Sequence, residues 1–329
     1  MHTRAVFPTA SARAGMYESF YLRAVSLTEP VGIWIRNTVH KAPGRRPMGS
    51  VWCTVFDAAR GRPFMHKITT DRLGVPGETW IAVGDDAQEG AVLGPGRAEG
   101  RCGDASWSLS FSSQERELRH LPRGWLYRAP LPRTKATSPL PAAEFDGVVE
   151  LPERRIELRS WPGMVGHNWG SEHAERWIWL HGVGFEGAPA AWLDVALGRV
   201  RIAGRLTPWL ANGALAIDGR RHRLGGLSAR GLSVSESVDG CALTLPGEDG
   251  LTVQARVEVP AGAAAGWRYS DPRGGDHDVV NCSVSALELA LTLPHGRGRR
   301  TLRTAHGAAY ELGMRERDHG VPIAPFTDG

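Results

Sequence analysis

Alternation of apolar and polar residues is the feature that most limits what this chain can fold into. In segment after segment, every second residue is apolar, which is the period of a β-strand with one buried face. Glycine, proline and aspartate separate the segments at intervals of about 8–12 residues, a spacing typical of antiparallel β-sandwiches and barrels. The strands predicted in this way are 17–25, 32–40, 51–57, 79–83, 107–111, 144–151, 154–161, 176–183, 191–200, 213–217, 232–238, 243–245, 251–259, 279–293 and 299–304.

The length of the chain predicts more than one domain. It has 329 residues, which exceeds an average domain, and it lacks the helices that alternate with strands in α/β folds. We therefore predict an all-β protein with two consecutive antiparallel domains, residues 1–174 and 175–329, and an ordered junction at 161–175. One short polar helix is predicted at 113–120, and the proline-rich segment 128–141 is predicted to be an extended surface connection.

The charge pattern argues against a nucleic-acid partner. The formal net charge is +4, and only three of the 39 cationic residues are lysine. Such an excess of arginine, with abundant alanine and glycine, fits a GC-rich coding sequence. The basic clusters at 220–223 and 297–303 are short and are not interleaved with aromatic residues, whereas a nucleic-acid interface needs a larger basic face.

The compartment is predicted from two further features. No apolar run approaches the ~18 residues of a spanning helix, and residues 1–15 lack the apolar core of a signal peptide. The four cysteines are isolated, as expected for buried thiols in a reducing compartment. We therefore expect a cytoplasmic protein and leave peripheral contact with a membrane open.

One glycine pattern matches a cofactor motif by chance. Gly182, Gly184 and Gly187 have the spacing of a dinucleotide-binding loop, but Pro189 and a strand follow instead of a helix. We interpret the pattern as a hairpin turn, and we expect no cofactor.

The segment 161–192 carries the most functional information, because it holds five of the twelve tryptophans. Strand alternation places Trp177, Trp179 and His181 on one face of a strand, and Trp192 with Asp194 on one face of the next. The same parity groups other aromatic and polar residues elsewhere in the chain, namely Trp34 with Arg36, and Trp267 with Tyr269 and Asp271.

Two interpretations of these aromatic faces are open. A barrel interior lined with tryptophan and a few polar groups suits an apolar ligand with one or two polar handles. Alternatively, the aromatic side chains fill the core and their polar tips bond to the backbone.

A metal site is a further alternative. His167, His173 and His181 are six and eight residues apart, and no helical pair of histidines exists. The alternative that we favour has no metal, and in it His167 and Asn168 close a tight turn through side-chain to backbone hydrogen bonds.

Three motifs give the chain a family resemblance. They are the pair Glu18–Arg23 and Ile33–Thr38, the run Gly163–Gly170 (GMVGHNWG) followed by Trp177 and Trp179, and the end motif Ala309–Gly313. The sequence resembles the carotenoid 1,2-hydratase (hydroxyneurosporene synthase) and AttH-like group, which is related to tocopherol cyclase. The resemblance implies two tandem antiparallel lipocalin-like β-barrel domains of the calycin type. It also implies a large hydrophobic small-molecule ligand, isoprenoid- or polyketide-like.

Hydration or cyclisation of such a ligand needs an acid that protonates an alkene. A carboxylic acid in an apolar cavity stays protonated, because burial disfavours its charge. The predicted catalytic residues are Asp194, Asp271, Tyr269 and Glu172. The predicted ligand-binding residues are Trp34, Arg36, His167, Asn168, Trp169, His173, Trp177, Trp179, His181, Trp192 and Trp267. A cofactor-independent hydratase or cyclase and a non-catalytic lipid carrier both fit this pattern, and only the enzyme requires an inward carboxylate.

Overall fold

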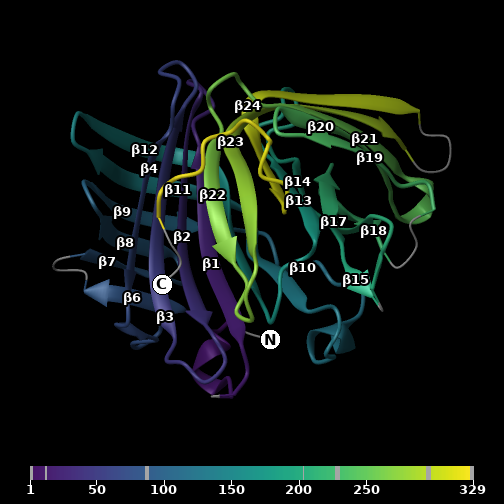
Figure 1. The fold of residues 1–329 in the computed structure, drawn as a ribbon. Coiled ribbons are helices and arrows are strands. Elements are labelled where there is room, and N and C mark those ends of the chain that lie inside the picture. Colours follow the sequence, from purple (N-terminus) through teal and green to yellow (C-terminus); the bar gives the residue numbers. More distant parts are fainter. Residues whose placement is uncertain are drawn as a thin grey trace.

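The computed structural model describes residues 3–11, 13–85, 89–202, 204–226, 230–293 and 298–326, and two large antiparallel sheets account for most of them (Figure 1). Among these residues there is no α-helix, and three short 3₁₀ turns, η1 (Phe7–Thr9), η2 (Gly124–Tyr127) and η3 (Glu248–Gly250), lie between strands. The prediction of an all-β fold with antiparallel sheets is therefore confirmed. No helix in the described part of the chain is long and apolar enough to cross a membrane.

Sheet A has twelve strands and curls into a nearly closed barrel. Its hydrogen-bonded order is β4-β3-β2-β1-β12-β11-β9-β8-β7-β6-β5, with β10 paired to β11. The first strand, β1, therefore pairs with the last strand, β12. The strands are β1 (Met16–Val25), β2 (Val31–Lys41), β3 (Met48–Asp57), β4 (Phe64–Thr70), β5 (Leu73–Gly74), β6 (Ile81–Asp85), β7 (Glu89–Gly94), β8 (Arg97–Cys102), β9 (Ala105–Ser112), β10 (Leu118–Arg119), β11 (Thr134–Leu151) and β12 (Arg154–Gly170).

Sheet B is the second large sheet. Its order is β18-β17-β14-β13-β24-β23-β21-β20-β19, with β22 paired to β23, and a bridge joins Leu224 of the edge strand β18 to Gly247, which follows β20. A small separate hairpin is formed by β15 (Arg201–Ile202) and β16 (Arg205–Leu206). The strands of sheet B are β13 (Arg176–Gly182), β14 (Trp192–Arg199), β17 (Leu210–Ile217), β18 (Arg220–Gly225), β19 (Ser233–Ser237), β20 (Gly240–Pro246), β21 (Thr252–Glu258), β22 (Ala265–Ser270), β23 (Asp276–Thr292) and β24 (Arg299–Met314).

Two predicted connections turned out to be parts of sheet A. The predicted helix at 113–120 is wrong, because Leu118 and Arg119 form β10 and pair with β11. Leu118 is the one apolar residue of this segment and is buried. A single apolar residue cannot form the apolar stripe by which a helix packs on a core. The predicted surface connection 128–141 is wrong from Thr134 onward, where β11 begins. Register shifts at 137–143 interrupt the ladder where Pro139 and Pro141 could not donate hydrogen bonds.

The segment 161–175 is ordered, and most of it is strand. Residues 161–170 are the second half of β12, which pairs with β1 on one side and with β11 on the other. Only residues 171–175 lie between the two sheets. That the sheets mark two domains, 1–174 and 175–329, stays a prediction. The predicted hairpin turn at 182–187 is confirmed, since β13 and β14 pair across it.

The interior of each sheet is filled by aliphatic and aromatic side chains from one face of every strand. In β1, Phe20, Leu22 and Ala24 face the interior of sheet A, and in β13, Ile178 and Leu180 face that of sheet B. The four cysteines are free and buried. The sheets pack against each other through the opposite faces of β1, β2, β3 and β12 on one side, and of β13, β14, β22, β23 and β24 on the other. We call this layer the inter-sheet seam.

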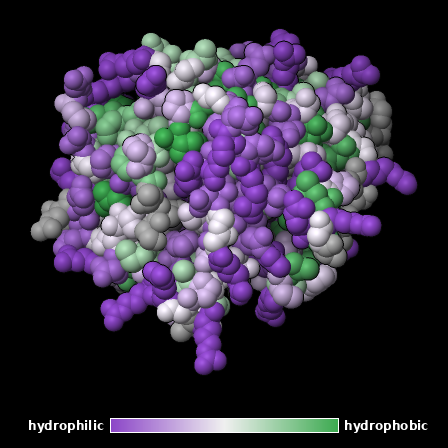
Figure 2. All heavy atoms as spheres, viewed as in Figure 1, coloured by the Kyte–Doolittle hydropathy of each residue, from purple (hydrophilic) through white to green (hydrophobic). Residues whose placement is uncertain are grey.

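The outer surface contrasts with the seam. On the face shown in Figure 2, hydrophilic side chains cover the centre, over the β22–β23 hairpin that lies in front of the seam in Figure 1. Buried polar side chains are concentrated in the seam, beneath this hydrophilic surface. Buried polar clusters are typical of functional sites, so the seam is the candidate location.

Candidate functional site

The tryptophan-rich strand faces point into the seam and not into a barrel interior. Trp177, Trp179 and His181 share one side of β13, as alternation predicts, while the interior side is taken by Ile178 and Leu180. The expectation that these faces line the inside of a barrel is therefore wrong. The reason is that seam strands are buried on both faces, and period two alone does not say which buried face meets the partner sheet.

A small cavity opens inside the seam. It has a volume of about 20 Å³, room for about one water molecule. Both sheets and the link between them contribute to its walls. The residues that line it are Tyr17, Ser19, Arg36, Thr38, Val39, His40, Trp52, His173, Tyr269 and Ser270.

Arg36 brings a positive charge to this cavity. Its Nε and Nη2 donate to the hydroxyl of Ser19 at 3.0 and 2.6 Å. Its guanidinium carbon lies 4.0 Å from the centre of the Tyr269 ring and 5.6 Å from that of Trp52. No carboxylate of the described residues pairs with it within 4 Å, although it is only 5% exposed. An aromatic cage around an unpaired guanidinium is suited to an electron-rich oxygen of a ligand.

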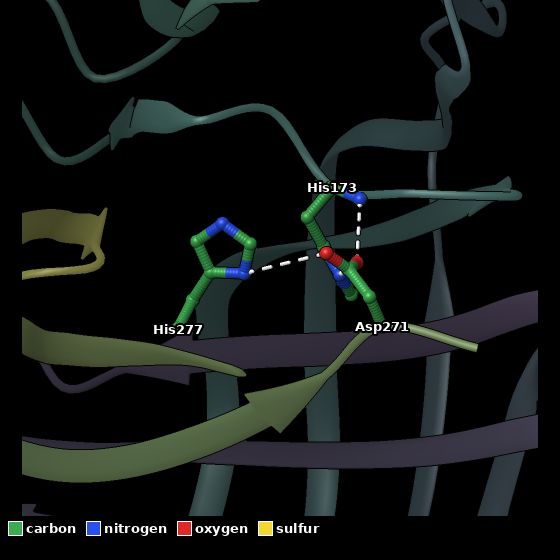
Figure 3. Close-up of side chains that lie close together, drawn as sticks. All are labelled: His173, Asp271 and His277. Atoms are coloured by element: carbon green, nitrogen blue, oxygen red, sulfur yellow. Dashed lines mark hydrogen bonds and ion pairs between the residues drawn. The ribbon is translucent and has the colours of Figure 1, made fainter. Parts of the chain in front are cut away.

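His173 and Asp271 form a hydrogen-bonded pair at the cavity wall. Asp271 Oδ1 accepts from the main-chain N–H and from Nδ1–H of His173, both at 2.8 Å (Figure 3). The imidazole stacks on Tyr17 with ring centres 3.9 Å apart. In the described structure its Nε2 is buried and has no hydrogen-bond partner. An imidazole held through Nδ1 with Nε2 free has the arrangement of a general base or acid.

The protonation of Asp271 differs from what the sequence predicts. Burial raises its pKa, but the hydrogen bonds and charge of His173 outweigh burial, so the pKa lies below its usual value. The carboxyl group is therefore ionised and cannot protonate an alkene. In this structure its Oδ1 holds His173 through two hydrogen bonds.

His277 completes a cluster with this pair. It comes from the start of β23, is 0% exposed, and its Nδ1 lies 3.8 Å from Asp271 Oδ2 (Figure 3). Neither of its ring nitrogens has a hydrogen-bond partner among the described residues. Burial, with the charges of His173 and Arg315, lowers its pKa to about 4, so the ring is neutral at physiological pH. His173, Asp271 and His277 are thus the residues that could hold a metal ion.

Asp194 lies deeper in the seam, in a separate network. It is 0% exposed and accepts hydrogen bonds from Trp179 Nε1 at 3.1 Å and from the hydroxyl of Ser138. His120 Nε2 lies 3.5 Å from its Oδ2. Burial raises the pKa of Asp194, but the charge and hydrogen bond of His120 lower it below the usual value. The pKa of Asp194 is therefore lowered and not raised as burial alone predicts, and the carboxylate binds polar side chains across the seam.

This network predicts a pH-dependent contribution to stability. Burial lowers the pKa of His120, but Asp194 outweighs burial and raises it above 6.5. The stability that His120 contributes is present below pH 6.5 and is lost as pH rises through its raised pKa. The stability that Asp194 contributes is present above pH 3.8 and is lost as pH falls through its lowered pKa. We expect His120→Gln to be destabilised, relative to wild type, more near about pH 5 than near about pH 9 in urea denaturation.

Comparing the two proteins at each pH removes the effect of other histidines. The pKa of His181 and that of His277 are lowered to about 4, mainly by burial, so both destabilise the fold as pH falls in either protein. An equal loss of stability at the two pH values would contradict a raised pKa for His120.

The remaining predicted residues are dispersed. His167 Nε2 lies 2.7 Å from Glu18 Oε1, and its ring stacks on Phe20 and on Trp169 inside sheet A. His181 contacts Arg23 at 2.8 Å, so the three predicted histidines do not meet at one point.

Other predicted residues lie outside the cavity. Half-buried Asn168 is on the opposite side of β12 from His167, and Glu172 pairs with Arg133 near the surface, so neither lines it. The three tryptophans Trp34, Trp192 and Trp267 are fully buried in the apolar part of the seam.

Several residues of the site were missed. Tyr17 and Ser19 alternate with Glu18 and Phe20, so parity would have placed both on one face of β1, opposite Glu18 and Phe20. Trp52 alternates in the same way in β3. No pattern in the sequence singles out His277. It lies beside Asp271 because the register of the β22–β23 hairpin places Tyr269 opposite His277.

A sequence relative covers nearly the whole chain. No protein-family profile matches the chain. Over 327 residues it is 27% identical to an uncharacterised protein of Mycobacterium tuberculosis, found in two strains, with 94% of this chain and 90% of that protein covered.

Three solved structures share the architecture over nearly all of their length. CghA has a TM-score of 0.62 at 11% identity, covering 97% of this chain and 95% of CghA. Kievitone hydratase of Nectria haematococca has a TM-score of 0.54 at 7% identity, covering 92% of this chain and 89% of the hydratase. A protein assigned as an AttH of Nitrosomonas europaea has a TM-score of 0.53 at 13% identity, covering 94% of this chain and 97% of that protein. The resemblance inferred from the sequence is confirmed at the level of the fold: the chain has the architecture of the AttH-like and hydratase structures.

Proposed function

We propose that the chain binds a lipophilic small molecule with an oxygen function in the inter-sheet seam and adds or removes water there. The observation that carries the proposal is the cavity itself. Its walls combine the aromatic rings of Tyr17, Trp52 and Tyr269 with polar side chains. Among these are Arg36, which has no carboxylate partner within 4 Å among the described residues, and His173, whose Nε2 has no hydrogen-bond partner there. This is the composition of a small-molecule site with a few placed polar groups. The shared fold of a protein named as a hydratase agrees with it.

The cavity must enlarge before such a ligand can bind. Sites for ligands of this size have volumes of roughly 300–1,000 Å³, whereas this cavity has about 20 Å³. The walls belong to different sheets, so a small separation along the seam would widen it without breaking a strand pair. Isoprenoid- and polyketide-like molecules are the ligand class that we propose.

The residues can carry out a hydration with balanced proton transfer. For an alkene conjugated to a carbonyl, Arg36 would donate to the carbonyl oxygen and stabilise the negative charge that develops there. His173 Nε2 would accept a proton from water as the water oxygen bonds to the β-carbon, and would return that proton to the α-carbon. Asp271 would keep Nδ1–H of His173 in place and stabilise the imidazolium.

The test separates binding from turnover. A panel of isoprenoid and polyketide-like enones would be incubated with the protein, with binding read by quenching of tryptophan fluorescence and hydration by the mass of one added water. We expect His173→Gln to keep binding and to lose turnover by about 10²-fold or more. Arg36→Gln should weaken binding, because the ligand oxygen loses its charged donor.

Two controls define the opposite outcomes. Arg256, whose side chain is 74% exposed on sheet B, is the matched control for Arg36, and Arg256→Gln should bind and react normally. If wild type binds a ligand and returns it unchanged, the protein is a carrier. If no ligand of the panel quenches fluorescence, or if His173→Gln turns over as fast as wild type, the proposed site is wrong.

A further inference from the structure

The cluster at the end of the β22–β23 hairpin has features that the proposed acid–base role does not need. His173 comes from the link between the sheets, Asp271 follows β22, and His277 is the second residue of β23. The exposed fractions of their side chains are 9%, 3% and 0%. One potential ligand atom from each lies within 4.8 Å of the others (Figure 3).

Unpartnered polar atoms converge at this point. In the described structure both ring nitrogens of His277 and Oδ2 of Asp271 are buried without a hydrogen bond. A buried polar group without a partner is costly, and a fully buried imidazole with neither nitrogen bonded is unusual. One bound cation would provide a partner for both His277 Nδ1 and Asp271 Oδ2, which lie 3.8 Å apart.

The donor set selects the kind of cation. Two imidazoles and one carboxylate suit a divalent transition metal ion such as Zn²⁺, and three protein ligands leave a fourth position for water. The two imidazole ring centres are 5.8 Å apart and the rings are inclined at 61°, so they are not stacked face to face. The four cysteines are buried and lie outside the cluster.

Arg315 is the charge that opposes a cation here. Its Nη2 lies 3.6 Å from Asp271 Oδ2, and its Nε pairs with Glu175 at 3.2 Å. The Arg315 side chain is 37% exposed, so it can turn outward toward Glu175 while the ion occupies the carboxylate. Removing this guanidinium should therefore favour metal binding.

We propose that His173, Asp271 and His277 form a binding site for one divalent transition metal ion. The ion would take the lone pair of His173 Nδ1, and the ring proton would then lie on Nε2. A metal-loaded chain would therefore have no free imidazole base in the cavity, so the ion and the acid–base role of His173 exclude each other. The site itself does not depend on the proposed function, and its test uses no small-molecule ligand.

The experiment measures metal binding by the full chain. After treatment with a chelator and removal of the chelator, Zn²⁺ is titrated by calorimetry, and Co²⁺ is added to a second sample for its visible absorption. We expect one ion per chain and Co²⁺ bands of nitrogen and oxygen coordination. His277→Gln should lower the affinity by about 100-fold or more, since even changes to the partners of metal ligands cost 10–100-fold.

Two further variants keep the test decisive. His306, in β24 and outside the cluster, is the matched control, and His306→Gln should bind as wild type does. Arg315→Gln removes the opposing charge without removing a ligand and should bind at least as tightly as wild type. The proposal is overturned if wild type binds no ion at about 100 μM, if His277→Gln binds equally well, or if His306→Gln loses binding instead. A tenfold weakening in Arg315→Gln would also overturn it.

Discussion

Replacing Trp267 with alanine is expected to lower the free energy of unfolding by about 3–5 kcal/mol. The indole is 1% exposed and lies between the two sheets, with ring centres 5.0 Å from Trp52, 6.3 Å from Trp34 and 6.0 Å from Phe326. The alanine would leave a cavity that none of these rings can fill without losing another contact. Urea denaturation followed by circular dichroism measures the change.

Trp125 is the matched control for this prediction. Its side chain is 65% exposed in η2, so Trp125→Ala should change the free energy of unfolding by less than about 0.5 kcal/mol. If the two variants are equally stable, the sheets do not pack through Trp267, and the arrangement of the seam is wrong.

Asp194→Ala is expected to have a similar effect for an electrostatic reason. Removing one partner of a buried ion pair costs about 3–5 kcal/mol, because the remaining groups keep the cost of burial without their partner. Here Trp179 Nε1, the Ser138 hydroxyl and His120 would all lose the same acceptor. Asp194→Asn keeps the shape and one carbonyl oxygen, and should be destabilised less. Thermal or urea denaturation near neutral pH measures both.

The control for Asp194 is an aspartate without such contacts. Asp318 is exposed in the C-terminal segment, and Asp318→Ala should be neutral within about 0.5 kcal/mol. A neutral effect of Asp194→Ala would show that His120 and Ser138 find other partners and that the network is not rigid.

The β-character and the faces of the strands could be predicted from the sequence, because alternation depends only on neighbouring residues. It correctly grouped Trp177, Trp179 and His181, and Trp192 with Asp194. Which side of a doubly buried strand meets the other sheet depends on packing between distant segments. Alternation carries no information on that, and the aromatic faces were therefore assigned to the wrong space.

The charge states could not be predicted, because they depend on partners from misassigned segments. His120 belongs to the predicted helix and Ser138 to the predicted surface connection, yet both contact Asp194. Without them, burial alone predicts a neutral acid; with them, the pKa of Asp194 falls. Asp271 is a similar case, since its partner His173 comes from the link between the sheets.

The pairing of β1 with β12, and of β13 with β24, also sets the order of events during synthesis. The β1 strand gains its second neighbour only after Gly170 has left the ribosome, and β13 only after Met314 has done so. Until the second sheet arrives, Trp34 and Trp52 on the outer side of the first sheet face water. The nascent chain thus displays an aromatic patch for about the time needed to translate half of the protein, about ten seconds or more at 5–20 residues per second.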